Sequence, residues 1–286
     1  MDNILNQMIG AYENITVLDK KNSIKEVMQE IVLCGLSRAG FFKYAAFYGG
    51  TALRIFYGLD RFSEDLDFSL KVADPEFDLN DFLPLLEKEV KSYGVNFDIE
   101  EKIKSGDSNI KSAFLKGNTK EHLLIFYNEQ IPSIPHNEII KVKVEVDVNP
   151  PEFATFENKF RLLPIPYQVT LYDKSSLFSG KLHAVICRGW KSRIKGRDLY
   201  DYIFYLSNNT PFNLKHLEAR LKQTDFIPSE KEITLDDVKK ILCDRFRTID
   251  FAQAKQDVLP FIKNVNALDI WSEEFFVAIT ENLRAE

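Results

Sequence analysis

Hydrophobic residues recur along this chain with two different spacings. Ile24, Val27 and Ile31 share one face at helical spacing, so residues 1 to about 43 are expected to be helical, as are residues 82 to about 94. From there to residue 148 the apolar residues come in short runs between polar or proline-containing turns, which is typical of strands. The predicted strands cover residues 95–100, 110–115, 123–127 and 139–148.

Helical spacing returns after the Pro164-Ile165-Pro166 segment and continues to residue 283. The predicted helices cover residues 177–188, 197–206, 214–221, 235–246 and 267–283. The pattern therefore predicts an α+β fold, with a mixed α/β domain over residues 1–170 and an α-helical domain over residues 171–286.

Two acidic residues stand on one predicted strand. Asp65 and Asp67 are separated by one residue, so their side chains point to the same face of that strand. Two carboxylates in this arrangement can hold one or two divalent metal ions, which in turn can bind a nucleoside triphosphate. Taken alone, such a pair is more often a solvated surface.

A glycine turn precedes these acids. The apolar run 45–48 leads into Gly49, Gly50 and Thr51, and residues 51–57 follow at helical spacing. Glycines allow the backbone to approach a phosphate closely, and Thr51 is a plausible N-cap for a helix whose first amides face that phosphate. A tight turn would explain the glycines but not the acids that follow.

Strand-turn-helix followed by Asp-x-Asp resembles the signature of polymerase-β-like nucleotidyltransferases, and more narrowly the AbiEii/AbiGii-type toxin nucleotidyltransferases. The resemblance implies a third carboxylate on a neighbouring strand. Residues 141–148 alternate without interruption between valines and charged residues, so Glu145 and Asp147 are the candidates, with Glu145 slightly favoured. Without the resemblance, a half-buried strand with a solvated charged face would be the better interpretation.

The second half carries two further elements of the same family. Lys181-Leu182-His183-Ala184 resembles its Lys-Leu-x-Ala element, and residues 197–201 resemble its Arg-Asp-x-x-Asp element. The resemblance implies that Lys181 contacts triphosphate oxygens as a point charge. Asp198 would bind metal, orient Lys181 or act as a base. Helix capping by Asp198 and an Arg197–Asp201 pair are the structural alternatives.

The resemblance covers most of residues 40–205 and implies fold, cofactor and reaction together. The fold would be a polymerase-β-like lobe with a mixed or antiparallel sheet, followed by a helical lobe. Asp65 and Asp67 would hold Mg²⁺ (or Mn²⁺) on the substrate NTP, and Arg61, Ser63 and Arg188 would assist in binding its phosphates. Gly50 stands where many such enzymes have serine, which leaves phosphate binding to backbone amides and Thr51.

Charge and composition narrow the possible partners. The net charge of −6 disfavours nucleic acid in general, but residues 181–197 contain six basic residues and no acid. No run approaches the roughly 20 apolar residues of a membrane span, and the first residues lack a secretory pattern. The three cysteines, widely separated, argue against a disulfide framework or a zinc site. We therefore expect a cytoplasmic protein without a membrane partner.

The implied function is that of the toxin in a bacterial toxin–antitoxin or phage-defence pair, with a cognate antitoxin as partner. The acceptor would be RNA, foremost transfer RNA, or protein. A phosphohydrolase with Asp65 as nucleophile and a catalytically inactive regulatory module remain alternatives. The first lacks a downstream Lys and Asp-Asp pair, and the second is disfavoured by the intact acids.

Overall fold

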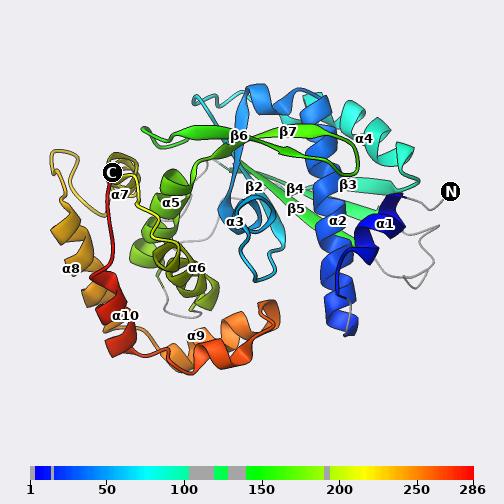
Figure 1. The fold of residues 1–286 in the computed structure, drawn as a ribbon. Coiled ribbons are helices and arrows are strands. Elements are labelled where there is room, and N and C mark those ends of the chain that lie inside the picture. The colour runs from blue at the N-terminus through cyan, green and yellow to red at the C-terminus, as the bar shows by residue number, and fades with distance from the viewer. Residues whose placement is uncertain (1–3, 14–15, 103–118, 128–139, 190–193) are drawn as a thin grey trace.

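The structure is a computed structural model that describes residues 4–13, 16–102, 119–127, 140–189 and 194–286. These residues form ten α-helices and one seven-stranded mixed sheet (Figure 1). The α+β class expected from the sequence is confirmed. The predicted strand at 110–115 lies outside the described residues.

The sheet has the strand order β3-β4-β5-β2-β1-β7-β6. β2 pairs in parallel with β5, β1 pairs in parallel with β7, and the other neighbours are antiparallel. The strands are β1 (Ala45–Tyr48), β2 (Asp65–Leu70), β3 (Asn96–Lys102), β4 (Thr119–Tyr127), β5 (Ile140–Asp147), β6 (Phe156–Arg161) and β7 (Tyr167–Tyr172).

Two of these strands were not predicted. β6 contains no fully buried side chain and carries four charged or amide residues in six, so it lacks a hydrophobic run. β7 directly follows the proline segment, where the pattern was interpreted as the beginning of the helical half. Parallel pairing with β1 and antiparallel pairing with β6 decide its conformation, and both are tertiary effects.

The helices of the first half lie against one face of the sheet. α2 contacts α4, β5 and β7, and α4 contacts β3. α2 begins with a reciprocal capping box between Thr16 and Asp19, which fixes its first turn. The helices are α1 (Ile4–Gly10), α2 (Val17–Arg38), α3 (Gly49–Tyr57) and α4 (Leu83–Ser92).

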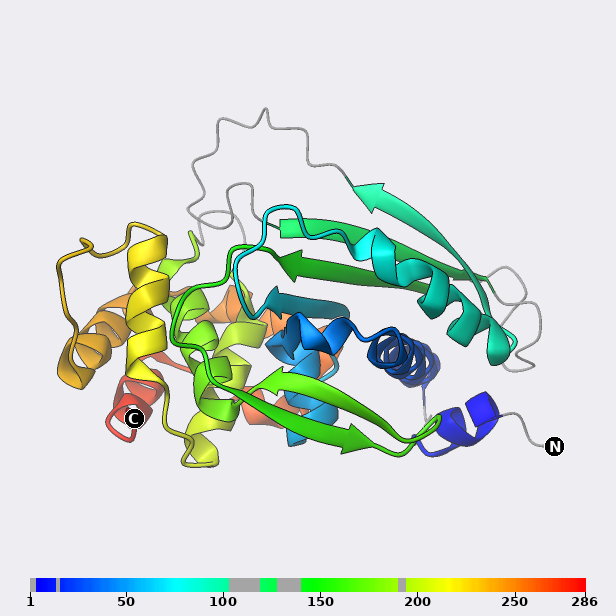
Figure 2. The same cartoon turned by 90° about the horizontal axis from the view of Figure 1, so that it is seen from above.

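The helices of the second half gather beyond α3, on the side away from α2, and the two chain ends lie on opposite sides of the molecule (Figures 1 and 2). They are α5 (Lys174–Cys187), α6 (Gly196–Ser207), α7 (Leu214–Gln223), α8 (Leu235–Phe246), α9 (Phe251–Val258) and α10 (Glu273–Thr280). Among the described residues, none of the helices combines the length and apolarity needed to cross a bilayer.

Two clusters of buried hydrophobic residues stabilise this arrangement. The first lies between α2, α4 and the sheet, and its members run from Leu5 to Leu171. The second lies among α5–α10, and its members from the second half of the chain begin with Tyr172. Ala46, Leu53 and Leu59, from the first half of the chain, also belong to it. The division at residues 170 and 171 stays a prediction, but each half has a core of its own.

Successive side chains of a strand point to opposite faces of the sheet, and this alternation determines which of them face the second half of the chain. On β2, Leu66 and Phe68 belong to the first core, and on β5 Val144 and Val146 do the same. The intervening residues of both strands therefore point to the opposite face. This face carries the acidic residues.

Candidate active site

The glycine turn joins β1 to α3 and packs directly on the acids. Gly49 has a φ of 83°, and a Cβ atom built there would lie 2.3 Å from Oδ2 of Asp67. A Cβ at Gly50 would lie 2.7 Å from Nη2 of Arg61 and 2.9 Å from Oγ of Ser63. Side chains at either position would clash, so the close approach of this turn to the strand requires both glycines.

Thr51 does not cap α3. The helix begins at Gly49 with Tyr48 at the N-cap position, so Thr51 is its third residue. Its buried hydroxyl donates to the backbone carbonyl of Asp65. The expectation of a Thr51 N-cap was wrong, because the helix starts two residues earlier. The amides at the start of α3 carry the partial positive charge of a helix N-terminus.

Asp67 and Glu145 are neighbours across β2 and β5. The parallel register places Asp65 beside Lys143 and Asp67 beside Glu145. Burial, with the charges of Glu145 and Asp65 added to it, raises the pKa of the Asp67 carboxyl well above its usual range. Nζ of Lys143 donates to Glu145. Burial also raises the pKa of Asp65.

Asp147 lies two residues beyond Glu145 on β5, opposite Ser69. Burial raises the pKa of its carboxyl, and the Asn149 amide and the Arg220 charge oppose that shift. Both candidates for the third carboxylate therefore face the same side, but Glu145 is the one adjacent to Asp67. The register favours Glu145, as the sequence did.

The donor set suits a divalent cation. Among the described residues, no three acidic, histidine or cysteine side chains form a ready-made metal cage. Asp67 and Glu145 nevertheless bring carboxylate oxygens together in a partly buried position where the ionised forms repel each other. A hard cation would relieve this repulsion and would take oxygen ligands of this kind. The metal roles of Asp65, Asp67, Glu145 and Asp147 stay predictions.

Lys181 belongs to a buried network of ion pairs. Its Nζ lies 2.7 Å from Oδ1 of Asp198 and 2.8 Å from Oδ2 of Asp201. Nη1 of Arg188 lies 3.1 Å from Oδ2 of Asp198. Although burial acts to raise it, Arg188 and Lys181 lower the pKa of Asp198 to about 2. A carboxylate held so strongly in its charged form is a weak proton acceptor, so this geometry corresponds to the orienting role for Asp198.

Arg61 is held away from the phosphate position expected for it. Its guanidinium donates two hydrogen bonds of 2.6 Å to the carboxylate of Asp201, and its side chain is 3% exposed. Arg197, expected as the alternative partner of Asp201, instead lies 3.6 Å from Glu64. The Arg-Asp-x-x-Asp element therefore anchors the two halves to each other through Asp201.

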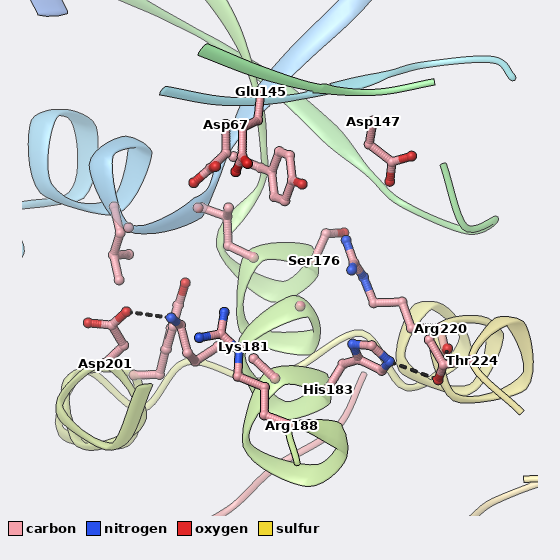
Figure 3. A pocket seen from close by; sticks show the side chains of 18 of the residues that line it. Asp67, Glu145, Asp147, Ser176, Lys181, His183, Arg188, Asp201, Arg220 and Thr224 are labelled. Carbon is pink, nitrogen blue, oxygen red and sulfur yellow. Dashed lines mark hydrogen bonds and ion pairs between the residues drawn. The ribbon is translucent and has the colours of Figure 1, made fainter. Parts of the chain in front are cut away.

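These groups surround a cavity of about 230 Å³ between the sheet and helices α5–α7. In Figure 3, Asp67 and Glu145 descend from the sheet toward Lys181 and Arg188 on α5 and its end. Asp201 lies on the Lys181 side, and Asp147 lies nearer Arg220. The cavity walls thus bring together Gly49, Gly50, Asp67, Glu145, Asp147, Lys181 and Arg188 from the predicted set. Asp65, Arg61, Ser63, Thr51 and Asp198 lie outside its lining.

Several lining residues were not expected from the sequence. They include Tyr48, Arg220 and Thr224, together with His183, to which the sequence analysis gave no role of its own. Nε2 of His183 lies 3.0 Å from Oγ1 of Thr224, and burial is the main cause that lowers the pKa of this histidine to about 3. Arg220 comes from α7, in a segment without any motif, so only the packing of α7 beside α5 could reveal it.

The basic run after α5 is only partly described. Lys191 and Arg193 lie outside the described residues, whereas Lys195 precedes α6 and Arg188 lines the cavity. Contact between this run and an acceptor is a prediction that the described residues do not test.

Comparisons with known proteins bear on the family and the fold of this chain. The family model "Nucleotidyl transferase AbiEii toxin, Type IV TA system" matches residues 31–277. No curated protein matches the sequence. A solved structure of MenT4, a nucleotidyltransferase toxin from Mycobacterium tuberculosis H37Rv, is similar over 99% of this chain and 90% of its own, with 16% identity and a TM-score of 0.58. JHP933 from Helicobacter pylori aligns over 91% of this chain and 94% of its own, with 20% identity and a TM-score of 0.45. The resemblance and the fold expected from the sequence are confirmed.

Proposed function

Because the chain belongs to the AbiEii family of nucleotidyltransferase toxins, we propose that it transfers a nucleoside monophosphate from an NTP to an RNA or protein acceptor with Mg²⁺ or Mn²⁺ as cofactor. The family identifies the chain as a toxin nucleotidyltransferase and disfavours the phosphohydrolase and the inactive regulatory module. The observation that carries the proposal is the carboxylate pair Asp67 and Glu145, which faces Lys181 and Arg188 across one cavity beside the start of α3.

The carboxylates of Asp65, Asp67 and Glu145 are proposed to hold the cation on the triphosphate. When bound, Mg²⁺ polarises the α-phosphate and favours ionisation of the acceptor hydroxyl. The amides of Gly49 and Gly50 contribute partial positive charge to the phosphates. Lys181 and Arg188 neutralise charge on the leaving pyrophosphate. Asp198 keeps these two side chains in place through its ion pairs with them.

Arg61 and Ser63 pack against the glycine turn of this site. Both touch the space that a Gly50 side chain would need, and Arg61 joins that turn to Asp201. Their proposed contribution is the position of the α3 N-terminus, in place of the direct phosphate contact suggested by the sequence. Thr51 acts similarly by fixing the backbone of Asp65.

The biological setting follows from the family description of a type IV toxin–antitoxin system. We propose a cognate antitoxin that antagonises the enzyme or represses its expression, and a role in phage defence. Transfer RNA is the first acceptor to test. The cytoplasmic location suggested by the cysteine pattern stays a prediction.

The test is transfer of label to an acceptor. Purified protein is incubated with each α-³²P-labelled NTP and either total RNA or a cell extract freed of nucleic acid, with Mg²⁺, with chelator, and with Mg²⁺ restored. We expect label in the acceptor only when metal is present. Asp67→Asn and Asp65→Ala should abolish it while the circular-dichroism spectrum is unchanged. Release of phosphate without a labelled acceptor would instead support the phosphohydrolase.

A further inference from the structure

The cavity has a second cationic position, at Arg220. Lys181 forms ion pairs with Asp198 and Asp201, so the protein itself already supplies carboxylate partners for this cation. Arg220 lies near Asp147 instead (Figure 3), and within the described parts of the chain it forms no ion pair with a carboxylate. An arginine that lies beside a cavity and is not tied into an ion pair is suited to bind an anion from outside.

Arg220 is held in position by His216. Nε of Arg220 donates to Nε2 of His216 over 3.0 Å, and Nδ1 of His216 donates to the carbonyl oxygen of Glu152 over 2.7 Å. One neutral tautomer satisfies both bonds, and burial, which lowers the pKa of His216 to about 3, maintains it. His216 therefore connects the arginine on α7 with the loop that follows β5.

That loop presents an aromatic ring. Phe153 adopts a φ of 63°, a conformation that bulky residues rarely adopt, and is 58% exposed. Nδ2 of Asn213 donates to its carbonyl oxygen over 2.9 Å. Helix α7 and its N-cap residue thus hold adjacent carbonyls of this loop, at Glu152 and Phe153, which keeps the ring at the surface.

Phe153 borders a groove of about 660 Å³ that adjoins the cavity, with Gln223 in the lining of both. Phe156 lines the same groove and is 39% exposed. Lys71 and Lys222 are balanced there by Glu152 and Glu218. Because these charges balance, a ligand in the groove would bind mainly through the aromatic surface.

The chemistry assigns the two ends of the cavity. In-line displacement places the attacking hydroxyl and the leaving pyrophosphate on opposite sides of the α-phosphorus. If pyrophosphate leaves toward Gly49 and Lys181, the acceptor enters from the side of Asp147 and Arg220. A nucleic-acid acceptor carries a phosphate one nucleotide away from its terminal hydroxyl and has bases that can stack on an aromatic ring.

We propose that Arg220 binds a backbone phosphate, and Phe153 stacks on a base, of a single-stranded nucleic-acid acceptor, with His216 as the positioning residue for both. This subsite rests on the proposed transfer reaction. It selects nucleic acid over protein, since a protein hydroxyl brings neither an adjacent phosphate nor a base.

Binding is tested first without nucleotide, by fluorescence anisotropy of a labelled single-stranded RNA oligonucleotide. Arg220→Gln and Phe153→Ala should each weaken binding about tenfold, the size of one lost stacking or charge contact. Phe153→Trp should retain the affinity for RNA. Arg220→Gln should reduce by about one the slope of the logarithm of the binding constant against the logarithm of the salt concentration. Arg247→Gln, on an exposed arginine of the helical half, is the control and should change neither quantity.

Transfer kinetics then separate the acceptor from the nucleotide. With total RNA as acceptor, Arg220→Gln and Phe153→Ala should raise the KM for RNA about tenfold and leave the KM for NTP within twofold. His216→Asn keeps a donor for the Glu152 carbonyl, whereas His216→Gln keeps an acceptor for Arg220. Each variant should lose part of the affinity for RNA. In the double variant, His216→Asn should add little to the loss of RNA affinity that Arg220→Gln causes alone.

The possible failures are distinct. If the wild-type protein labels no acceptor, the proposed function fails. If it labels RNA but Arg220→Gln and Phe153→Ala bind RNA normally, or raise the KM for NTP instead, the subsite is overturned. Labelling of protein alone overturns it as well.

Discussion

Glu145 lies directly opposite Asp67 in the parallel pairing of β2 with β5, and their proximity disfavours ionisation of both carboxyl groups at once. The apo protein therefore contains a site that is electrostatically incomplete. Its stability should depend on pH and on divalent cations in a way that ordinary surface acids do not.

Asp67→Asn should stabilise the apo protein at neutral pH. A raised pKa in the folded state means that the contribution of Asp67 is most favourable below its unfolded value of 3.8 and is lost as pH rises through the folded value. We expect the free energy of unfolding of the variant to exceed that of the wild type by about 1 kcal/mol at pH 8 and to equal it near pH 4. Urea unfolding across this range measures the difference. Asp244→Asn, at an exposed acid, should show no such trend.

Asp198 should have the opposite dependence. Its pKa in the folded state is lowered to about 2, so its contribution is present above the unfolded value of 3.8 and is lost as pH falls toward 2. The shift corresponds to about 2 kcal/mol. Asp198→Asn should lower stability at pH 7 by at least that amount and flatten the acid limb of the unfolding curve. A wild-type curve without loss between pH 4 and 2 would contradict the assignment.

Gly49→Ala should abolish transfer, whereas Gly58→Ala should not. Both glycines have φ near 80°, so each substitution costs about 1 kcal/mol of backbone strain. Among the residues that the structure describes, a Cβ at Gly58 meets nothing within 4 Å, but one at Gly49 would meet Asp67. Comparing urea unfolding and transfer rate in the two variants isolates the contact with the carboxylate.

The Arg61–Asp201 pair should be required for stability, since both side chains are almost completely buried. Arg61→Leu leaves Asp201 without its main partner and should cost about 3 to 5 kcal/mol. The double variant Arg61→Leu/Asp201→Leu should recover much of this loss. Arg247→Ala, which breaks an exposed pair with Asp244, should cost less than 1 kcal/mol.

Lys181→Ala should weaken binding of the triphosphate, and Lys181→Arg should restore part of it because the charge remains while its geometry changes. Isothermal titration with Mg²⁺ and a non-hydrolysable NTP measures this step without turnover. Lys222→Ala removes a lysine paired with Glu218 on the preceding turn of its own helix and serves as the control. Normal binding by Lys181→Ala would assign the lysine to the ion network alone.

The sequence predicted the parts of this site that follow from local spacing. The alternation of residues 141–148 placed Glu145 and Asp147 on one face, and the Asp-x-Asp pair did the same for β2. Register between strands is a tertiary property, so the choice between the two carboxylates required the structure. The same holds for Arg220, whose place in the cavity depends on how α7 packs against α5.

Arg61 shows the opposite case. Its proximity to Asp-x-Asp in the chain suggested a phosphate ligand, but its partner Asp201 lies 140 residues further on. No local pattern reveals a pairing of that range. β6 was missed for a related reason, since its conformation depends on β7 more than on its own residues.

The long separation between Arg61 and Asp201 also has a consequence for synthesis of the chain, because the site cannot be completed before both residues have been made. The carboxylates, the glycine turn and Arg61 all leave the ribosome well before α6 does. Until α6 emerges, Lys181 lacks both of its carboxylate partners and the turn at Gly50 lacks the anchor that Arg61 and Asp201 provide. A nascent chain or a fragment that ends before α6 would therefore lack the carboxylates that hold Lys181 and Arg61, and we expect transfer only from chains that extend beyond Asp201.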